Sequence, residues 1–222
     1  MAVDAREIIE GLREEIRRLE RRPAHPAFFI PSGCAEVDAL LPGGGFPRGA
    51  ITELAGSAAS GKTEIALGAL TAAMGDEGLA AYVDGRGELY PPAVAALGLD
   101  LDRLLVVRPK GPDGGAGGGE AAHALWASEL LLASGAFEGV VVDVPIGSDP
   151  RCAMGGARLD AMLRRLRAAA EKGGGLALWL GAPEGTRVPG AVRLELSEGR
   201  TGRRVRRTFA REVAAFGVHH AA

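Results

Sequence analysis

The sequence lacks several features that mark specialised classes of protein. Its 222 residues include only two cysteines, four histidines and 5% aromatic residues. Cys34 and Cys152 are far apart and have no C-x-x-C partner, so a disulfide framework or a zinc site is not expected. No apolar run approaches the roughly 20 residues of a membrane span, and the charged N-terminus does not resemble a signal peptide. We therefore expect a cytoplasmic protein without membrane contact.

An excess of charge of one sign is also missing. The formal net charge is −2, and only three of the 26 basic residues are lysine. We interpret the arginine bias as GC-rich coding, which weakens any argument from a single arginine. A whole-surface attraction to nucleic acid is not expected, so any DNA contact must come from a local patch. The length and the 47% apolar content fit one globular domain with a full core.

One strongly specific pattern is present, the run Gly56-Ser57-Ala58-Ala59-Ser60-Gly61-Lys62-Thr63. It matches the phosphate-binding loop G-x-x-x-x-G-K-[ST], between an apolar segment at 50–54 and a helical pattern at 64–70. A glycine-serine connector that matches by accident is the alternative, but the flanking segments favour the motif. Backbone N–H groups and the helix N-terminus predict a cradle for the phosphates of ATP. Lys62 would reach the outer phosphates, and Thr63 would offer its hydroxyl to Mg²⁺.

Apolar strands alternate with helices along the chain. This alternation predicts an α/β fold with a mostly parallel central sheet, helices on both faces and an antiparallel hairpin at the C-terminal edge. We expect strands at 50–54, 79–84, 104–107, 139–143, 176–180, 192–196 and 203–211, the last two joined by a turn at 197–202. We expect helices at 34–41, 64–70, 91–97, 120–134 and 158–172.

The chain divides into a core and two short ends. We predict an N-terminal amphipathic helix within 1–24, a proline-interrupted connector at 25–31, a core domain at 32–213 and a tail at 214–222. The helix either packs on its own domain or docks on a neighbouring subunit or partner. The glycine-rich segment 110–119 predicts a surface loop rather than a lid, because nothing in it can do chemistry.

Two further groups of residues could act at a site. Asp143 ends an apolar strand, where a carboxylate beside a phosphate loop can hold the Mg²⁺ shell, although many strands end in Asp. The final hairpin is rich in arginine, which predicts contact with DNA phosphates or with a partner. Alternatively, these arginines protect an edge strand from pairing with other chains. They are Arg203, Arg204, Arg206, Arg207 and Arg211.

Taken in order, these motifs resemble the core of the bacterial recombinase RecA over about residues 30–213. The resemblance is carried by Ile30-Pro31-Ser32-Gly33, the glycine turn at 43–49, the phosphate loop, Ala81-Tyr82-Val83-Asp84, Val140-Val141-Val142-Asp143 and Val192-Arg193-Leu194-Glu195. The amino-acid sequence of residues 32–54 and 81–92 resembles the ImuA family of RecA-like accessory proteins more closely than it resembles RecA itself. That resemblance implies a RecA-like P-loop core and a role in the SOS response, in error-prone translesion DNA synthesis. It also implies partners, namely RecA, ImuB and an error-prone C-family DNA polymerase.

The sequence departs from RecA where RecA places working groups. Arg86 stands where RecA has the glutamate that activates water, Ala93 where it has the adenine-stacking tyrosine, and Gly181 where it has the γ-phosphate-sensing glutamine. The segment 182–191 is far shorter than the second DNA-binding loop of RecA. Loss of a general base commonly costs about 10²–10⁴-fold in rate. We therefore expect retained phosphate binding, weak or absent ATP hydrolysis and weak DNA binding.

An enzymatic alternative remains. Glu88 lies two residues beyond Arg86 and is the candidate base, although such a displacement rarely preserves attack geometry. With Asp143 on Mg²⁺, the chain would then be a DNA-stimulated ATPase or a recombinase paralogue.

Overall fold

The computed structural model describes residues 28–109, 119–146, 156–190, 192–199 and 202–210. The predicted N-terminal helix, the predicted tail and nearly all of the glycine-rich loop lie outside these residues.

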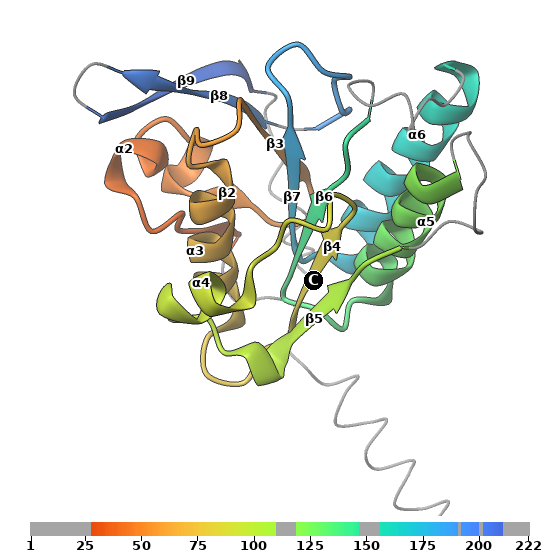
Figure 1. Cartoon of the computed structure of the whole chain (residues 1–222), viewed down its shortest axis with the longest axis horizontal. Coiled ribbons are helices and arrows are strands. Elements are labelled where there is room, and N and C mark those ends of the chain that lie inside the picture. The colour runs from red at the N-terminus through yellow and green to blue at the C-terminus, as the bar shows by residue number, and fades with distance from the viewer. Residues whose placement is uncertain (1–27, 110–118, 147–155, 191, 200–201, 211–222) are drawn as a thin grey trace, which may run out of the picture.

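A seven-stranded sheet forms the centre of the fold (Figure 1). Its order is β5-β4-β6-β7-β3-β8-β9, and all neighbours are parallel except the last pair. The predicted α/β class, with a mostly parallel sheet and a C-terminal antiparallel hairpin, is confirmed. The strands are β3 (Ile51–Gly56), β4 (Ala80–Asp84), β5 (Leu104–Val107), β6 (Gly139–Asp143), β7 (Leu176–Gly181), β8 (Val192–Gly199) and β9 (Gly202–Ala210).

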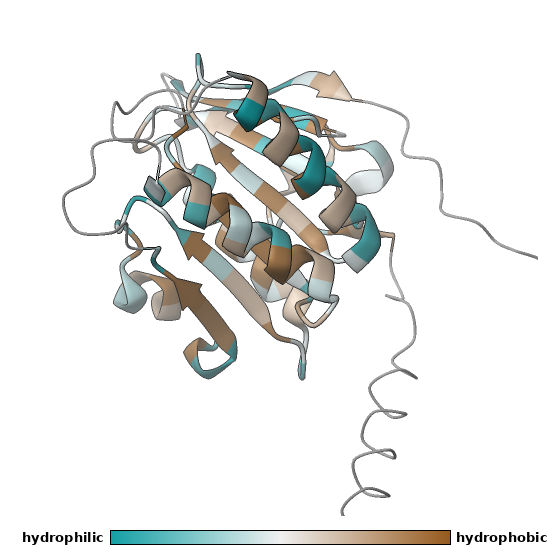
Figure 2. Ribbon diagram, turned by 90° about the vertical axis from the view of Figure 1, so that its right-hand side faces the viewer, coloured by the Kyte–Doolittle hydropathy of each residue, from teal (hydrophilic) through white to brown (hydrophobic). Residues whose placement is uncertain are grey.

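Helices lie on both faces of the sheet and create two cores. One face carries α2 (Ala35–Asp38), α3 (Lys62–Met74) and α4 (Pro91–Ala96), and the other carries α5 (Gly119–Ser134) and α6 (Gly156–Gly173), as Figures 1 and 2 show. Neighbouring residues of one strand enter different cores, because successive side chains point to opposite faces. On β7, Leu178 packs in the first core and Trp179 in the second.

Several boundaries differ from those predicted. The helix expected at 34–41 is only one turn, α2, and a 3₁₀ turn at Pro42–Gly44 follows it, with a second 3₁₀ turn at Leu101–Arg103. The hairpin turn is also tighter than 197–202, since β8 continues to Gly199 and β9 begins at Gly202.

The predicted connector contains a short strand that the sequence did not reveal. β1 (Phe29–Ile30) pairs antiparallel with β2 (Phe46–Pro47). A Cβ at Gly45 would lie 2.7 Å from the carbonyl oxygen of Ile30, so only glycine allows this approach. Two-residue strands have no hydrophobic period, which is why the pattern did not predict them.

A buried ion pair joins β3 to β8. The alternation of apolar and charged residues at 192–196 predicts a half-exposed strand with Arg193 on its exposed side, but Arg193 is only 4% exposed. It lies opposite Glu53 in the strand register, and its guanidinium pairs with that carboxylate. A second guanidinium nitrogen donates to the carbonyl oxygen of Pro183 at 2.9 Å. The predicted half-exposed alternation is therefore wrong at this position, because a paired charge can be buried.

Removing one partner of this pair should destabilise the protein. In Arg193→Leu, Glu53 stays buried without a cation, so we expect a loss of about 3–5 kcal/mol in the free energy of unfolding, measured with urea. The control is the double variant Glu53→Leu/Arg193→Leu, which should recover much of that loss because no charge is left unpaired. Equal losses in the two variants would contradict the interpretation.

Candidate nucleotide-binding site

The phosphate loop, residues 56–63, lies between β3 and α3, as predicted from its flanking patterns. Two of its residues adopt the left-handed backbone conformation, Ala59 (φ 61°) and Gly61 (φ 80°). Gly56 cannot carry a side chain, since its Cβ would lie 2.3 Å from the hydroxyl oxygen of Ser60. The loop is thus a tight turn into the N-terminus of a 13-residue helix, the geometry that suits anion binding.

Lys62 is folded back over this loop. Its ammonium donates to the carbonyl oxygen of Ser57 at 2.9 Å and to that of Gly56 at 3.2 Å. Burial lowers the pKa of Lys62; Asp143 and Glu88 oppose this effect, and Arg86 adds to it. These four charged groups therefore share one electrostatic neighbourhood.

The turn after β4 is built on a buried carboxylate. Asp84 accepts hydrogen bonds from the backbone N–H groups of Glu88 at 3.0 Å and Leu89 at 3.2 Å. Arg108 donates to the same carboxylate at 2.8 Å. Because Asp84 lies beside Asp143 in the sheet register, the turn it holds passes next to the end of β6. Residue 86 is thereby brought to Asp143.

Asp143 is held by the protein through both of its oxygens. The Nε of Arg86 donates to Oδ1 at 2.8 Å, and the Tyr82 hydroxyl donates to Oδ2 at 3.0 Å. Burial raises the pKa of Asp143. The hydrogen bond and charge of Arg86 and the hydrogen bond of Tyr82 oppose that rise. Burial and the neighbouring carboxylate together raise the pKa of Tyr82. The guanidinium of Arg86 therefore lies against Asp143, at the position where the resemblance to RecA predicts a water-activating glutamate.

The residues present do not fit the Mg²⁺ shell that the resemblance implies. Mg²⁺ takes an octahedral set of oxygens at about 2.0–2.1 Å. Here both oxygens of Asp143 already accept protein hydrogen bonds, and Mg²⁺ beside Arg86 would meet repulsion of several kcal/mol at an effective dielectric constant of about 20. The assignment of Thr63 and Asp143 to Mg²⁺ stays a prediction that this arrangement does not favour.

The other predicted positions are placed as follows. Glu88 is exposed, and Ala93 is exposed on α4, one turn after Tyr90, which is 66% exposed. Gly181 ends β7, where a Cβ would lie 2.8 Å from the Glu53 carboxylate. The space that a sensing side chain would need at 181 is therefore filled by Glu53. Glu53 is one of the residues that resemble RecA, but the sequence pattern indicated no role for it.

The arginines of the final hairpin point to two different faces. Arg203 and Arg207 face the α3 side, where Arg203 donates to Glu64 at 2.6 Å and Arg207 to the carbonyl oxygen of Leu40 at 2.7 Å. The Arg203 guanidinium also lies against Gly61 of the phosphate loop. Arg204 and Arg206 face the opposite side. Arg211 lies outside the described residues.

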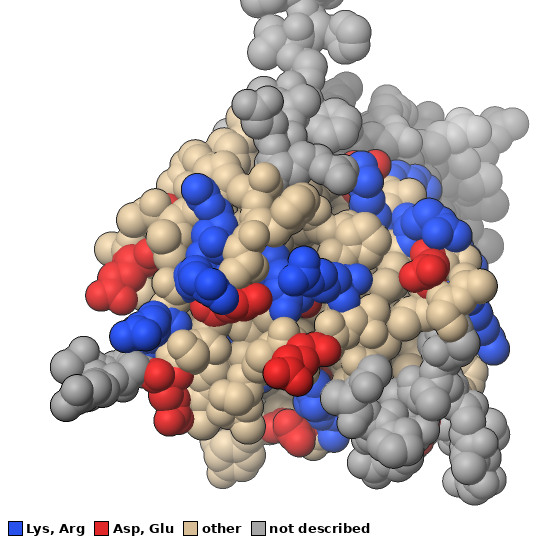
Figure 3. Space-filling model, turned by 90° about the horizontal axis from the view of Figure 1, so that it is seen from above, with Lys and Arg blue, Asp and Glu red and all other residues tan. Residues whose placement is uncertain are grey.

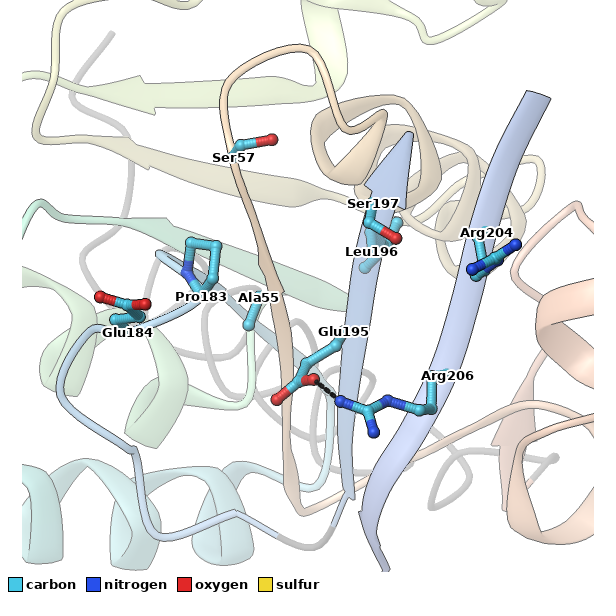
Figure 4. Close-up of a pocket in the computed structure, with 9 residues that line it drawn as sticks. All are labelled: Ala55, Ser57, Pro183, Glu184, Glu195, Leu196, Ser197, Arg204 and Arg206. Atoms are coloured by element: carbon cyan, nitrogen blue, oxygen red, sulfur yellow. Dashed lines mark hydrogen bonds and ion pairs between the residues drawn. The ribbon is translucent and has the colours of Figure 1, made fainter. Parts of the chain in front are cut away.

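A pocket of about 620 Å³ lies on that opposite side (Figure 4). Arg206 at its wall pairs with Glu195 at 2.7 Å, and the rest of the lining includes Ser57, Pro183, Ser197 and Arg204. Seen from the carboxyl ends of the parallel strands, basic side chains gather near the middle of the face with acidic ones beside them (Figure 3). The surface is of mixed charge rather than uniformly basic.

The sheet order, the phosphate loop and the acid at the end of β6 define a phosphate-loop α/β protein. The family model for the RecA N-terminal domain matches residues 10–169, and the chain belongs to that family. The predicted RecA-like core is thus confirmed, whereas the closer resemblance to ImuA stays a prediction.

Curated relatives agree with the family. The chain is 36% identical over 141 residues to Protein RecA of Salinispora tropica, which covers 64% of the chain and 38% of that protein. It is 37% identical over 137 residues to Protein RecA of Corynebacterium urealyticum, or 62% of the chain and 34% of that protein. It is 38% identical over 141 residues to Protein RecA of Streptococcus mutans, which is 64% of the chain and 34% of that protein. The chain therefore matches little more than a third of the length of these relatives. Among the described residues, no helix is long and apolar enough to cross a membrane.

Restoring glutamine at the end of β7 should harm the fold rather than rebuild a sensor. Gly181→Gln places a Cβ against the Glu53 carboxylate, which Arg193 holds, so we expect a loss of about 1–3 kcal/mol in unfolding free energy. Gly185→Gln is the matched control, because its Cβ would meet only ordinary contacts at 3.4 Å. Urea unfolding of both variants tests this, and equal stabilities would show that the space at 181 is not restricted.

Proposed function

We propose that this chain is a RecA-like accessory protein of error-prone translesion DNA synthesis, of the ImuA kind. It acts in the cytoplasm, mainly through contacts with RecA, ImuB and the error-prone C-family polymerase, and hydrolyses ATP weakly or not at all. The observation that carries the proposal is the Arg86–Asp143 ion pair beside a phosphate loop that keeps its place between β3 and α3.

The chemistry of Arg86 supports weak hydrolysis. A guanidinium keeps its protons throughout the physiological range, so it cannot take a proton from an attacking water. Glu88, the candidate base, is exposed on the turn that Asp84 holds. Without a positioned base the rate falls by about 10²–10⁴-fold. Nucleotide bound at residues 56–63 would then serve as an anchor of a binding scaffold.

The hairpin supports contact with a protein more than with DNA. Arg206 is paired with Glu195, and Glu184 also lines the pocket, so phosphate tracking by a run of free cations is not favoured. An alternating pattern of charge and a pocket beside it suit a partner of complementary charge. Direct DNA binding, if it occurs at this surface, would be weak.

Pull-down assays with purified RecA and ImuB test the partner proposal. Wild-type chain should retain both, and Arg204→Glu/Arg206→Glu should reduce retention of at least one by about tenfold or more. The matched control is Arg165→Glu/Arg167→Glu, which makes the same charge change on the exposed surface of α6. Failure of wild-type chain to bind either protein would overturn the proposal.

The second candidate is a DNA-stimulated ATPase that uses Glu88 as base and Asp143 on Mg²⁺. It is favoured by one observation, the electrostatic coupling of Glu88 and Asp143 to Lys62. Steady-state ATPase assays with and without single-stranded DNA distinguish the candidates. We expect turnover near background that Lys62→Ala does not change. Turnover that DNA stimulates and that Lys62→Ala and Glu88→Gln both abolish would support the enzyme instead.

A further inference from the structure

We propose that the phosphate loop of this chain takes its polyphosphate ligand without a divalent metal ion, with Arg86 supplying the positive charge that Mg²⁺ would otherwise supply. The inference rests on the proposed nucleotide binding and specifies the ligand form: an uncomplexed nucleoside triphosphate or diphosphate rather than its Mg²⁺ complex.

The charge balance of the site carries the first step. In their ordinary ionised forms, Lys62, Arg86, Glu88 and Asp143 together carry no net charge. A glutamate at position 86 would make that sum two net negative charges, which repel a polyphosphate unless a cation intervenes. The difference between the two residues is two units, the charge of one Mg²⁺. This chain therefore contains in its own side chains the charge that the metal would bring.

The position of Arg86 carries the second step. Its Nε binds Asp143 at 2.8 Å, which anchors the guanidinium at the end of β6, in the electrostatic neighbourhood of Lys62. Among the described residues, its two terminal nitrogens have no hydrogen-bond partner, and its side chain is 25% exposed. A guanidinium held at Nε, with no partner for its terminal nitrogens in the described part of the chain, is arranged to donate in bidentate fashion to a phosphate.

The loop gains a further cation from the hairpin. Arg203 of β9 lies against Gly61 and donates to Glu64 in the first turn of α3. Glu64 balances its charge, so Arg203 offers the loop guanidinium N–H donors beside Lys62 and the positive end of the α3 dipole. Three cationic side chains thus approach one loop from α3, from the turn after β4 and from β9. With the donors of the loop itself, they form a site for an anion of high charge.

Titration calorimetry with ATP on the full chain, in excess Mg²⁺ and in EDTA, tests the inference. Wild-type chain should bind ATP in EDTA at least as tightly as in Mg²⁺. Arg86→Glu should lose about tenfold or more of its affinity in EDTA and recover part of it in Mg²⁺, because the variant restores the need for a metal. The matched control Arg167→Glu makes the same charge change at an exposed arginine on α6 and should behave like wild type in both buffers.

A second variant separates the two roles of Asp143. If Asp143 only anchors Arg86, then Asp143→Asn removes a negative charge and should bind ATP in EDTA as tightly as wild type or more tightly. If Asp143 is a metal ligand, the same variant should lose affinity in Mg²⁺ by about tenfold or more. Circular dichroism of each variant shows whether it is folded.

The outcomes are separable. Wild-type binding that requires Mg²⁺ would overturn this inference and leave the proposed nucleotide binding intact. Absence of ATP binding in both buffers would overturn the nucleotide site itself, while the pull-down assays would still test the partner role independently.

Discussion

A carboxylate buried in a sheet needs a cation, and this requirement shapes the centre of the molecule. Glu53, Asp84 and Asp143 are the buried acids of the described sheet, and each is paired with an arginine from another segment. Each ion pair also fixes the segment that carries the arginine against the strand that carries the acid. Burial of an unpaired carboxylate would cost several kcal/mol. The fold therefore requires these ion pairs, and one of them, Arg86–Asp143, lies in the candidate nucleotide site.

The ion pair changes the role that Asp143, at the end of β6, can have. In a site with free acidic groups, such a carboxylate attracts a metal ion. Here its charge is already balanced by Arg86, which the turn after β4 delivers to it. In the function that we propose, this contact leaves no base at position 86, balances the charge of the predicted metal ligand and presents a guanidinium to the phosphates. A single residue thereby accounts for the weak hydrolysis and for the metal-free ligand that we propose.

The sequence predicted the parts of the molecule that have local signals. The phosphate loop, the alternation of strands and helices and the acid at 143 follow from residue patterns over a few positions, and the first two agree with the structure. The pairing of Arg193 with Glu53 could not be predicted in this way, because the residues are 140 positions apart and only the sheet order brings them together. The same holds for Arg203. The sequence places it in a basic cluster of the hairpin, and only the register of β9 shows that it lies against the phosphate loop.

The segment after β7 provides the last step. The resemblance to RecA predicts, at the end of this strand, a glutamine that senses the γ-phosphate. At Gly181 the space for that side chain belongs to Glu53, whose partner Arg193 also binds the carbonyl oxygen of Pro183. The start of the segment is thus tied to β8 and not to the nucleotide. Ligand binding and the surface beside the hairpin have no side chain at 181 to couple them, which is the arrangement expected when nucleotide anchors a scaffold rather than drives a cycle.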